Sequence, residues 1–123
     1  AEFYAAFQGA LEDTGQSDRI SALEEHVQHR ATEQSVRSLF EEAGFAVDAY
    51  QENVWTMRYA SGTALLNHFF VRVGFMQGWK QIATPGRELE TFEALESRLN
   101  AIAAEKGELA LTIPIGFFLA TKQ

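Results

Sequence analysis

The C-terminal segment 107–123 alternates large hydrophobic side chains with mostly smaller ones. The large residues from Leu109 to Leu119 stand at odd-numbered positions, and the even-numbered positions between them carry no charge. A period of two predicts a β-strand with its large side chains on one buried face. Because the other face is also uncharged, we expect a covering layer on both faces of this strand, as in a layered structure of helices and sheet.

A second strand is predicted at 45–59, directly after a helix over 32–43. Thr32 is suited to cap the start of this helix, and Gly44 is suited to the left-handed position that ends it. The polar residues at 52–53 interrupt the alternation of the strand, and we expect a bulge or bend there within one long strand. Two separate strands are the alternative.

Elsewhere the hydrophobic residues recur every three or four positions, which is typical of amphipathic helices. This spacing predicts two N-terminal helices and a helical insertion that begins at Ser61. Gly74 and Gly78 indicate a break within the insertion. A long helix with Leu95 and Leu99 on its hydrophobic stripe then leads to the last strand. The expected fold class is α/β or α+β, with about five helices covering a small sheet.

One domain is expected for residues 1–123. Its predicted parts are the N-terminal helices 2–30, the helix and strand 32–59, the helical insertion 61–106 and the terminal strand 108–121. Two strands alone form a marginal sheet in water. Either helices cover both faces of this sheet, or another chain completes it.

The composition argues against several classes of function. A net charge of −7 without a basic cluster argues against binding to nucleic acid. The absence of cysteine rules out a disulfide framework, a thiolate metal site and a cysteine nucleophile. No hydrophobic run is long enough to span a bilayer, and residues 1–13 lack the basic start of a signal peptide. We therefore expect a cytoplasmic protein that binds neither nucleic acid nor membrane.

Three segments together carry a family resemblance. Residues 35–47, SVRSLFEEAGFAV, form a helix that leads straight into a strand, and residues 111–122, LTIPIGFFLATK, form the terminal strand. In this combination the chain resembles the C-terminal part of a class I S-adenosylmethionine-dependent methyltransferase, which has a Rossmann-like fold. The terminal strand resembles the antiparallel strand that enters the family's otherwise parallel sheet. The stretch 61–107 resembles the variable insertion that often shapes the substrate side.

The cofactor site of that family resembles a nucleotide-binding half with a glycine-rich turn. Gly-x-Gly does not occur in this chain, and no strand–helix–strand unit precedes Thr32. The resemblance therefore implies the substrate-side C-terminal portion of a methyltransferase, inactive as an isolated chain. S-adenosylmethionine is the implied cofactor of the complete enzyme, and we expect no cofactor-binding and no catalytic residue here. The alternative is a small independent ligand-binding or dimerisation module with an aromatic-lined apolar pocket.

Aromatic residues cluster in strand 45–59 and in the insertion, where Phe70 and Phe75 belong to the same group. Such a cluster is typical of an apolar ligand pocket with a few polar groups, although packing in the core is the alternative. The candidate substrate-binding residues are Trp55, Tyr59, His68, Phe69 and Trp79, with Tyr59 and His68 as polar groups. His68 is also a conceivable general base, but a hydrogen-bonded histidine is the commoner case.

His26 and His29 lie at helical spacing beside acidic residues. Zinc accepts histidine and carboxylate ligands in such a pattern, but no third ligand is evident. We interpret this segment as a solvated polar helix face and predict no metal site.

The small number of strands predicts an open strand edge. Unpaired backbone groups at such an edge are a template for a second copy. We therefore predict a homodimer, formed through the open edge or by exchange of a strand or of the N-terminal helices. Pro114 cannot donate a ladder hydrogen bond, so it is expected at an edge or a bulge.

Overall fold

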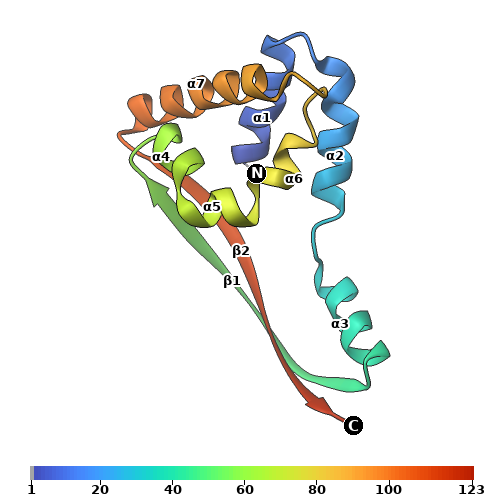
Figure 1. Cartoon of the computed structure of the whole chain (residues 1–123). Helices are drawn as coiled ribbons and strands as arrows, with labels where there is room; N and C mark the ends of the chain where they lie inside the picture. The colour runs from blue at the N-terminus through green and yellow to red at the C-terminus, as the bar shows by residue number, and fades with distance from the viewer. Residues whose placement is uncertain (1) are drawn as a thin grey trace.

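The computed structural model describes residues 2–123 as a mixed α+β fold (Figure 1). This part of the chain contains seven α-helices, one short 3-10 helix and two β-strands. Their bounds are α1 (Glu2–Asp13), η1 (Ser17–Arg19), α2 (Ile20–Gln28), α3 (Glu33–Glu42), β1 (Phe45–Tyr59), α4 (Gly62–Asn67), α5 (Phe69–Gly74), α6 (Met76–Lys80), α7 (Glu88–Lys106) and β2 (Leu109–Lys122). Among these helices none is long and apolar enough to cross a membrane.

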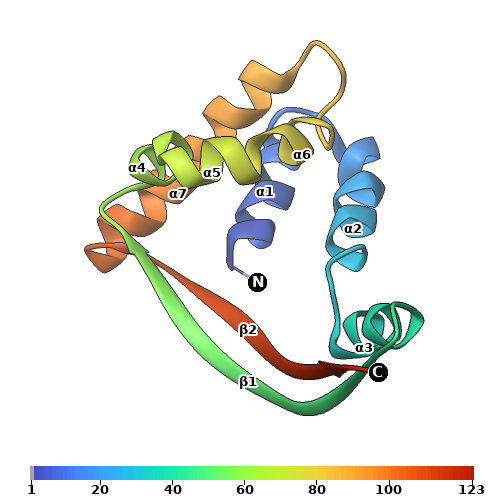
Figure 2. The same cartoon turned by 60° about the horizontal axis from the view of Figure 1, so that its bottom comes forward.

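β1 and β2 form an antiparallel two-stranded ribbon, with Phe45 opposite Lys122 at one end and Tyr59 opposite Leu109 at the other. The ribbon extends as an arm from the helical body formed by α1 and α4–α7, and α3 lies near its far end (Figures 1 and 2). Both predicted strands are confirmed. The expected cover on both faces of the terminal strand is wrong for the described residues, because Leu119 in the outer part of the arm is 64% exposed.

The predicted bulge is present in β1 but at a different place. The register shifts between Val47 and Ala49, whereas Glu52 and Asn53 pair regularly with β2. Asp48 at the shift accepts a hydrogen bond from the Thr121 hydroxyl at 2.5 Å. The prediction of a break at 52–53 was wrong because this part of the ribbon is uncovered on one side, so polar side chains there remain in water without leaving the strand.

The ribbon turns different faces toward the helices at its two ends. Near the helical body, Met57 and its partner Leu111 point toward α1 and α6. Near the tip, Phe118 lies beside Phe40 of α3, and its cross-strand partner Tyr50 packs against Phe118. These two cross-strand pairs lie on opposite pleat faces, since their positions differ by seven, an odd number, along each strand. The strong twist of a two-stranded ribbon accounts for the change of face.

Helix α3 begins and ends as predicted. The Thr32 side chain accepts a hydrogen bond from the Ser35 amide at 3.1 Å, and Gly44 ends the helix with a φ of 82°. This left-handed conformation favours glycine. The hydrophobic stripe of α3 is not buried, however, because the helix packs mainly against the tip of the arm, and Leu39 remains 65% exposed.

The insertion breaks at two places, and one of them is a predicted glycine. His68 lies between α4 and α5 and has an extended backbone. The His68 ring accepts a hydrogen bond from the Phe70 amide at 3.3 Å, which caps the start of α5. α5 ends at Gly74, so the break predicted there is confirmed, while Gly78 lies inside α6. Side-chain capping at His68 therefore decides the first break, and this signal was not used in the prediction.

The hydrophobic core lies where α1, α4 and α7 meet the start of β2. Its fully buried side chains include Phe7, Leu11, Leu95, Leu99 and Leu109, so the predicted stripe of the long helix is confirmed at its centre. Gly62 allows α4 to approach α7 closely, because a Cβ at this position would lie 2.4 Å from the Leu99 Cβ. Packing of this density makes the helical body a unit with its own core.

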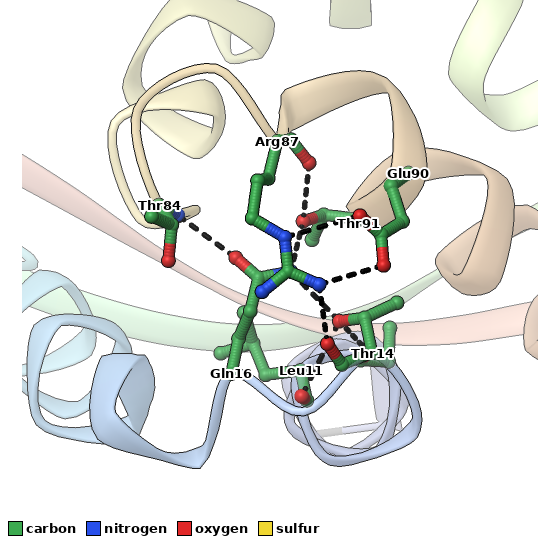
Figure 3. A network of polar contacts seen from close by, with 8 residues as sticks. Leu11, Thr14, Gln16, Thr84, Arg87, Glu90 and Thr91 are labelled. Atoms are coloured by element: carbon green, nitrogen blue, oxygen red, sulfur yellow. Dashed lines mark hydrogen bonds and ion pairs between the residues drawn. The ribbon is translucent and has the colours of Figure 1, made fainter.

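A buried polar network holds the end of α1 against the start of α7 (Figure 3). The Gln16 amide is fully buried and donates to the hydroxyls of Thr14 and Thr91, at 2.7 Å each. Its carbonyl oxygen accepts from the Thr84 amide at 2.9 Å. The Arg87 guanidinium adds a hydrogen bond to the Thr14 carbonyl oxygen at 2.6 Å. Every polar group of the Gln16 side chain is thus satisfied, as burial requires.

Candidate functional site

An apolar cleft of about 330 Å³ lies at the base of the arm, between the ribbon and helices α1, α5 and α6. It falls within the range of roughly 300–1,000 Å³ that is usual for small-molecule sites. Its lining residues are Glu2, Phe3, Tyr4, Arg30, Met57, Tyr59, Leu65, Phe70, Val71, Phe75, Trp79, Leu111, Thr112, Ile113 and Ile115. We call this site the aromatic cleft.

One wall of the aromatic cleft is a continuous row of rings. Phe75 and Trp79 are four residues apart, so the helical turn brings their rings together with centroids 5.6 Å apart and planes at 24°. Phe3 from α1 continues the row at 4.3 Å from Trp79, and Phe70 meets the edge of Phe75 at 5.6 Å. Flat aromatic surfaces of this kind bind planar or aliphatic groups by stacking and burial.

The polar groups of the cleft lie mainly at its rim. The Thr112 hydroxyl donates to the Glu2 carboxylate at 2.7 Å, and this hydrogen bond is the largest of several interactions that lower the pKa of Glu2 to about 2. The Arg30 guanidinium lies 5.6 Å from the centre of the Tyr4 ring, a cation–π distance. Burial raises the pKa of Tyr59, so its hydroxyl stays neutral at physiological pH.

Trp79 is the most deeply placed of the predicted site residues, with 6% of its surface exposed. Within the described residues its indole N–H is buried and has no hydrogen-bond acceptor. A buried donor without a partner is uncommon in folded proteins. Trp79 is therefore both a stacking surface and a sensitive reporter of changes in the cleft.

The structure brings two of the five predicted site residues together. Tyr59 and Trp79 line the aromatic cleft, whereas Trp55 and Phe69 do not, and they are 56% and 78% exposed. His68 lies beside Tyr59, with ring centroids 5.7 Å apart, but it caps α5 and does not line the cleft. Adjacent helical positions point about 100° apart, which separates Phe69 from its neighbour Phe70.

Several cleft residues were not among the predicted ones. Phe3 and Tyr4 come from α1, and Leu111 and Thr112 come from β2. The spacing of α1 predicted that Phe3 lies on a hydrophobic face, but it did not show which element this face meets. Only long-range packing brings α1 to the insertion, so no local pattern carried this information.

His26 of α2 and His29, which follows the helix, have ordinary structural surroundings. His26 packs on the Tyr4 ring at 5.9 Å, and its pKa is lowered by burial and by the nearby charges of Arg30 and His29. The His29 ring nitrogen lies 2.7 Å from the Glu25 carbonyl oxygen. Within residues 2–123, no three side chains of His, Cys, Asp or Glu come together as a possible metal site.

The titratable residues that line the aromatic cleft are Glu2, Tyr4, Arg30 and Tyr59, and the Thr112 hydroxyl is hydrogen-bonded to the Glu2 carboxylate. Comparisons with protein-family models, with curated proteins and with solved structures gave no match. The functional argument therefore rests on the cleft and on the exposed arm.

Proposed function

We propose that this chain is the substrate-side part of an S-adenosylmethionine-dependent methyltransferase and that the aromatic cleft binds the methyl acceptor. The observation that carries the proposal is the row of Phe3, Trp79, Phe75 and Phe70 along one wall of a cleft of about 330 Å³. This wall fits a small, largely apolar acceptor with a planar ring or a short aliphatic chain.

The exposed arm supports the first part of the proposal, that this chain belongs with a cofactor-binding half. Phe117 and Leu119 on β2 are 50% and 64% exposed, although they continue the alternating pattern of the buried base. Exposed apolar residues gathered on one element are typical of an interaction surface. In the family that the sequence resembles, the terminal strand has a neighbour on each side. A cofactor-binding half placed along the outer edge of β2 would supply that neighbour and cover the arm.

The proposed acceptor site is tested with the two tryptophan indole N–H groups as internal probes. Trp79 lines the cleft and Trp55 lies outside it, so a nitrogen–proton correlation spectrum carries one signal for each. Trp55→Phe assigns the two signals. We expect benzyl alcohol to shift the Trp79 signal saturably, with a dissociation constant on the order of 1 mM, and to leave the Trp55 signal in place. Equal shifts of both signals would contradict a site in the cleft.

Adjacent phenylalanines of α5 provide a matched control. Phe70 lines the aromatic cleft, whereas Phe69 points away and is more exposed. Phe70→Ala is expected to weaken the binding of benzyl alcohol at least about threefold, because one side of the ring wall is lost. Phe69→Ala is expected to leave it unchanged. An equal loss of affinity in both variants would show that the substitutions destabilise the protein in general and do not act through the wall of the cleft.

The methyltransferase assignment requires a separate test. The first step of this test is to sequence the gene upstream of the codon for Ala1. The second step is to compare the longer polypeptide with this chain by calorimetric titration with S-adenosylhomocysteine. We expect a glycine-rich turn in the upstream sequence, saturable binding by the longer polypeptide and no heat from this chain alone. A start codon directly before Ala1, or a longer polypeptide that does not bind, would contradict the assignment.

A small independent ligand-binding module is the second candidate. The observation that favours it is the complete core of the helical body, in which Phe7, Leu11, Leu95 and Leu99 are fully buried without any further chain. This candidate keeps the aromatic cleft as its binding site and needs no cofactor. Binding of benzyl alcohol together with a start codon directly before Ala1 would favour it over the methyltransferase.

A further inference from the structure

The outer edge of β1 is the longest uninterrupted open strand edge among the described residues. β1 runs from Phe45 to Tyr59 without proline or glycine, and β2 is its only strand neighbour in residues 2–123. In Figures 1 and 2 no helix lies beyond this edge along its middle. β2 differs, because Pro114 in its centre removes one backbone donor.

The regular part of this edge begins after the bulge. The register with β2 is unbroken from Ala49 to Tyr59, and the bulge at Asp48 disturbs the ladder before it. Strand pairing propagates along regular backbone and stops at bulges. A partner strand is therefore best accommodated on residues 49–59.

We infer that a second copy of this chain pairs with this edge, β1 against β1, around a two-fold axis at Trp55. A two-fold axis perpendicular to the sheet turns the same face of both copies to the same side. By symmetry, a residue a given number of positions before Trp55 lies opposite the residue the same number of positions after Trp55 in the second copy. Glu52 and Arg58 are each three residues from Trp55. Each copy thus places its Glu52 opposite Arg58 of the second copy, and the dimer contains two such pairs of oppositely charged side chains.

Only the axis at Trp55 places Glu52 opposite Arg58, and several other axes bring like charges together. An axis at Glu52 would place two like charges directly opposite each other, and an axis at Tyr50 would place Asp48 opposite Glu52. An axis at Asn53 would place Asp48 opposite Arg58, but it would run the new ladder through the bulge. With the axis at Trp55, residues 51–59 of both copies pair within the regular part of the strand.

The same register gives Trp55 a partner. Its side chain is 56% exposed on the isolated arm, and the axis places it directly opposite Trp55 of the second copy. Cross-strand aromatic pairs are among the favourable contacts of antiparallel sheets. The result is a four-stranded sheet, which is more stable than a two-stranded ribbon, with both aromatic clefts on the same face.

Charge reversal tests this register directly. The natural chain is expected to sediment as a dimer at roughly 50 µM. Glu52→Lys and Arg58→Glu each place like charges opposite each other twice, so each alone is expected to weaken the dimer at least about tenfold. Glu41→Lys, on the exposed side of α3, makes the same charge change away from the edge and is expected to leave the dimer intact.

Mixing the two reversed variants restores complementarity. The lysine introduced at position 52 of one variant then faces the glutamate introduced at position 58 of the other, and the unchanged Arg58 faces the unchanged Glu52. An equimolar mixture of Glu52→Lys and Arg58→Glu is therefore expected to form a heterodimer although each alone is monomeric. A monomeric natural chain, a dimer that survives both reversals, or a mixture that stays monomeric would each overturn the inference. Circular dichroism of each variant shows that it is folded, which matters because Arg58 also pairs with Glu108.

A cysteine at the axis gives an independent geometric readout. The chain has no cysteine of its own, so Trp55→Cys introduces a single thiol that the axis places opposite its symmetric copy. Mild oxidation is expected to give a disulfide-linked dimer. Asn53→Cys is the control, because Asn53 lies opposite Met57 in this register and its thiols are too far apart. Preferential crosslinking at position 53 would overturn the register. None of these outcomes depends on ligand binding in the aromatic cleft.

Discussion

Leu111 and Leu119 lie on the same strand and the same alternating pattern, but they have opposite surroundings. Leu111 at the base of β2 is 8% exposed, whereas Leu119 near the tip is 64% exposed. α1 and α7 contact the base of the strand, and α3 alone approaches the tip. The comparison teaches that alternation identifies the side chains that can be buried, while the neighbouring elements decide which of them are buried.

The largest expected difference between the two regions is in the cost of removing a leucine. Leu99→Ala leaves a cavity in the helical body and is expected to lower the free energy of unfolding by about 2–5 kcal/mol. Leu119→Ala removes an exposed side chain and is expected to change it by less than about 0.5 kcal/mol. Urea denaturation of the two variants measures both values. Similar losses would mean that the tip of the arm is covered in solution.

Gly62→Ala tests how closely α4 and α7 pack. The new Cβ would lie 2.4 Å from the Leu99 Cβ, so overpacking is expected to cost about 1–3 kcal/mol. Gly74→Ala is the matched control, since no atom lies within 4 Å of its Cβ position. The control is expected to be neutral or slightly stabilising, because alanine has a higher helix propensity than glycine. A thermal melt in which both variants lose equal stability would contradict close packing at Gly62.

Gln16→Leu probes the buried polar network at the end of α1. The substitution leaves the Thr84 amide without its acceptor, which is expected to cost about 1–3 kcal/mol. Gln8→Leu serves as the control, because Gln8 is exposed and bonds only to Glu12 at 3.1 Å. Its expected change is below about 0.5 kcal/mol. Amide hydrogen exchange at Thr84 and Thr91 reports whether the loss is local to the network.

The smallest expected effect is the pH dependence from Glu2 at the rim of the cleft. Several interactions, of which the hydrogen bond from Thr112 is the largest, lower the pKa of Glu2 from 4.5 to about 2, so the ionised carboxylate contributes to stability above about pH 4.5. The contribution is lost as pH falls toward 2, because the folded state then has to bind the proton. Glu2 is exposed, so screening by solvent keeps the effect below about 1 kcal/mol.

Thr112→Val isolates this hydrogen bond with little change in shape. The variant is expected to lose less stability than the natural chain between pH 4.5 and 2, in parallel acid titrations followed by circular dichroism. Identical unfolding curves of the two proteins between pH 4.5 and 2 would show that Thr112 does not hold the Glu2 carboxylate in its ionised form.

Much of the local structure could be predicted from residues whose effect is short-ranged. Thr32 and Ser61 cap the helices that they were expected to cap, and Gly107 ends α7 with a φ of 81°. These features depend on hydrogen bonds within a few residues. The break at His68 was missed, because a histidine cap depends on the side chain's own geometry and carries no strong compositional signal.

The candidate site was predicted only in part. Tyr59 and Trp79 were identified because aromatic residues gather in the insertion, whereas Phe3 and Tyr4 come from the other end of the chain. Phe69 and Phe70 are indistinguishable in the sequence, yet only Phe70 lines the cleft. The phase of a short helix relative to its neighbours is set by packing, and no local pattern contains it.

The sequence by itself determined which segments become helices and strands, where most of them begin and end, and which side chains are able to form a core. These outcomes follow from backbone propensities, caps and periodicity, all of which act over a few residues. Only the tertiary structure decided that α1 completes the aromatic cleft, that β1 bulges at Asp48, and that the arm leaves Leu119 in water. Each of these depends on contacts between residues far apart in the chain, and such contacts are chosen by the packing of the whole molecule.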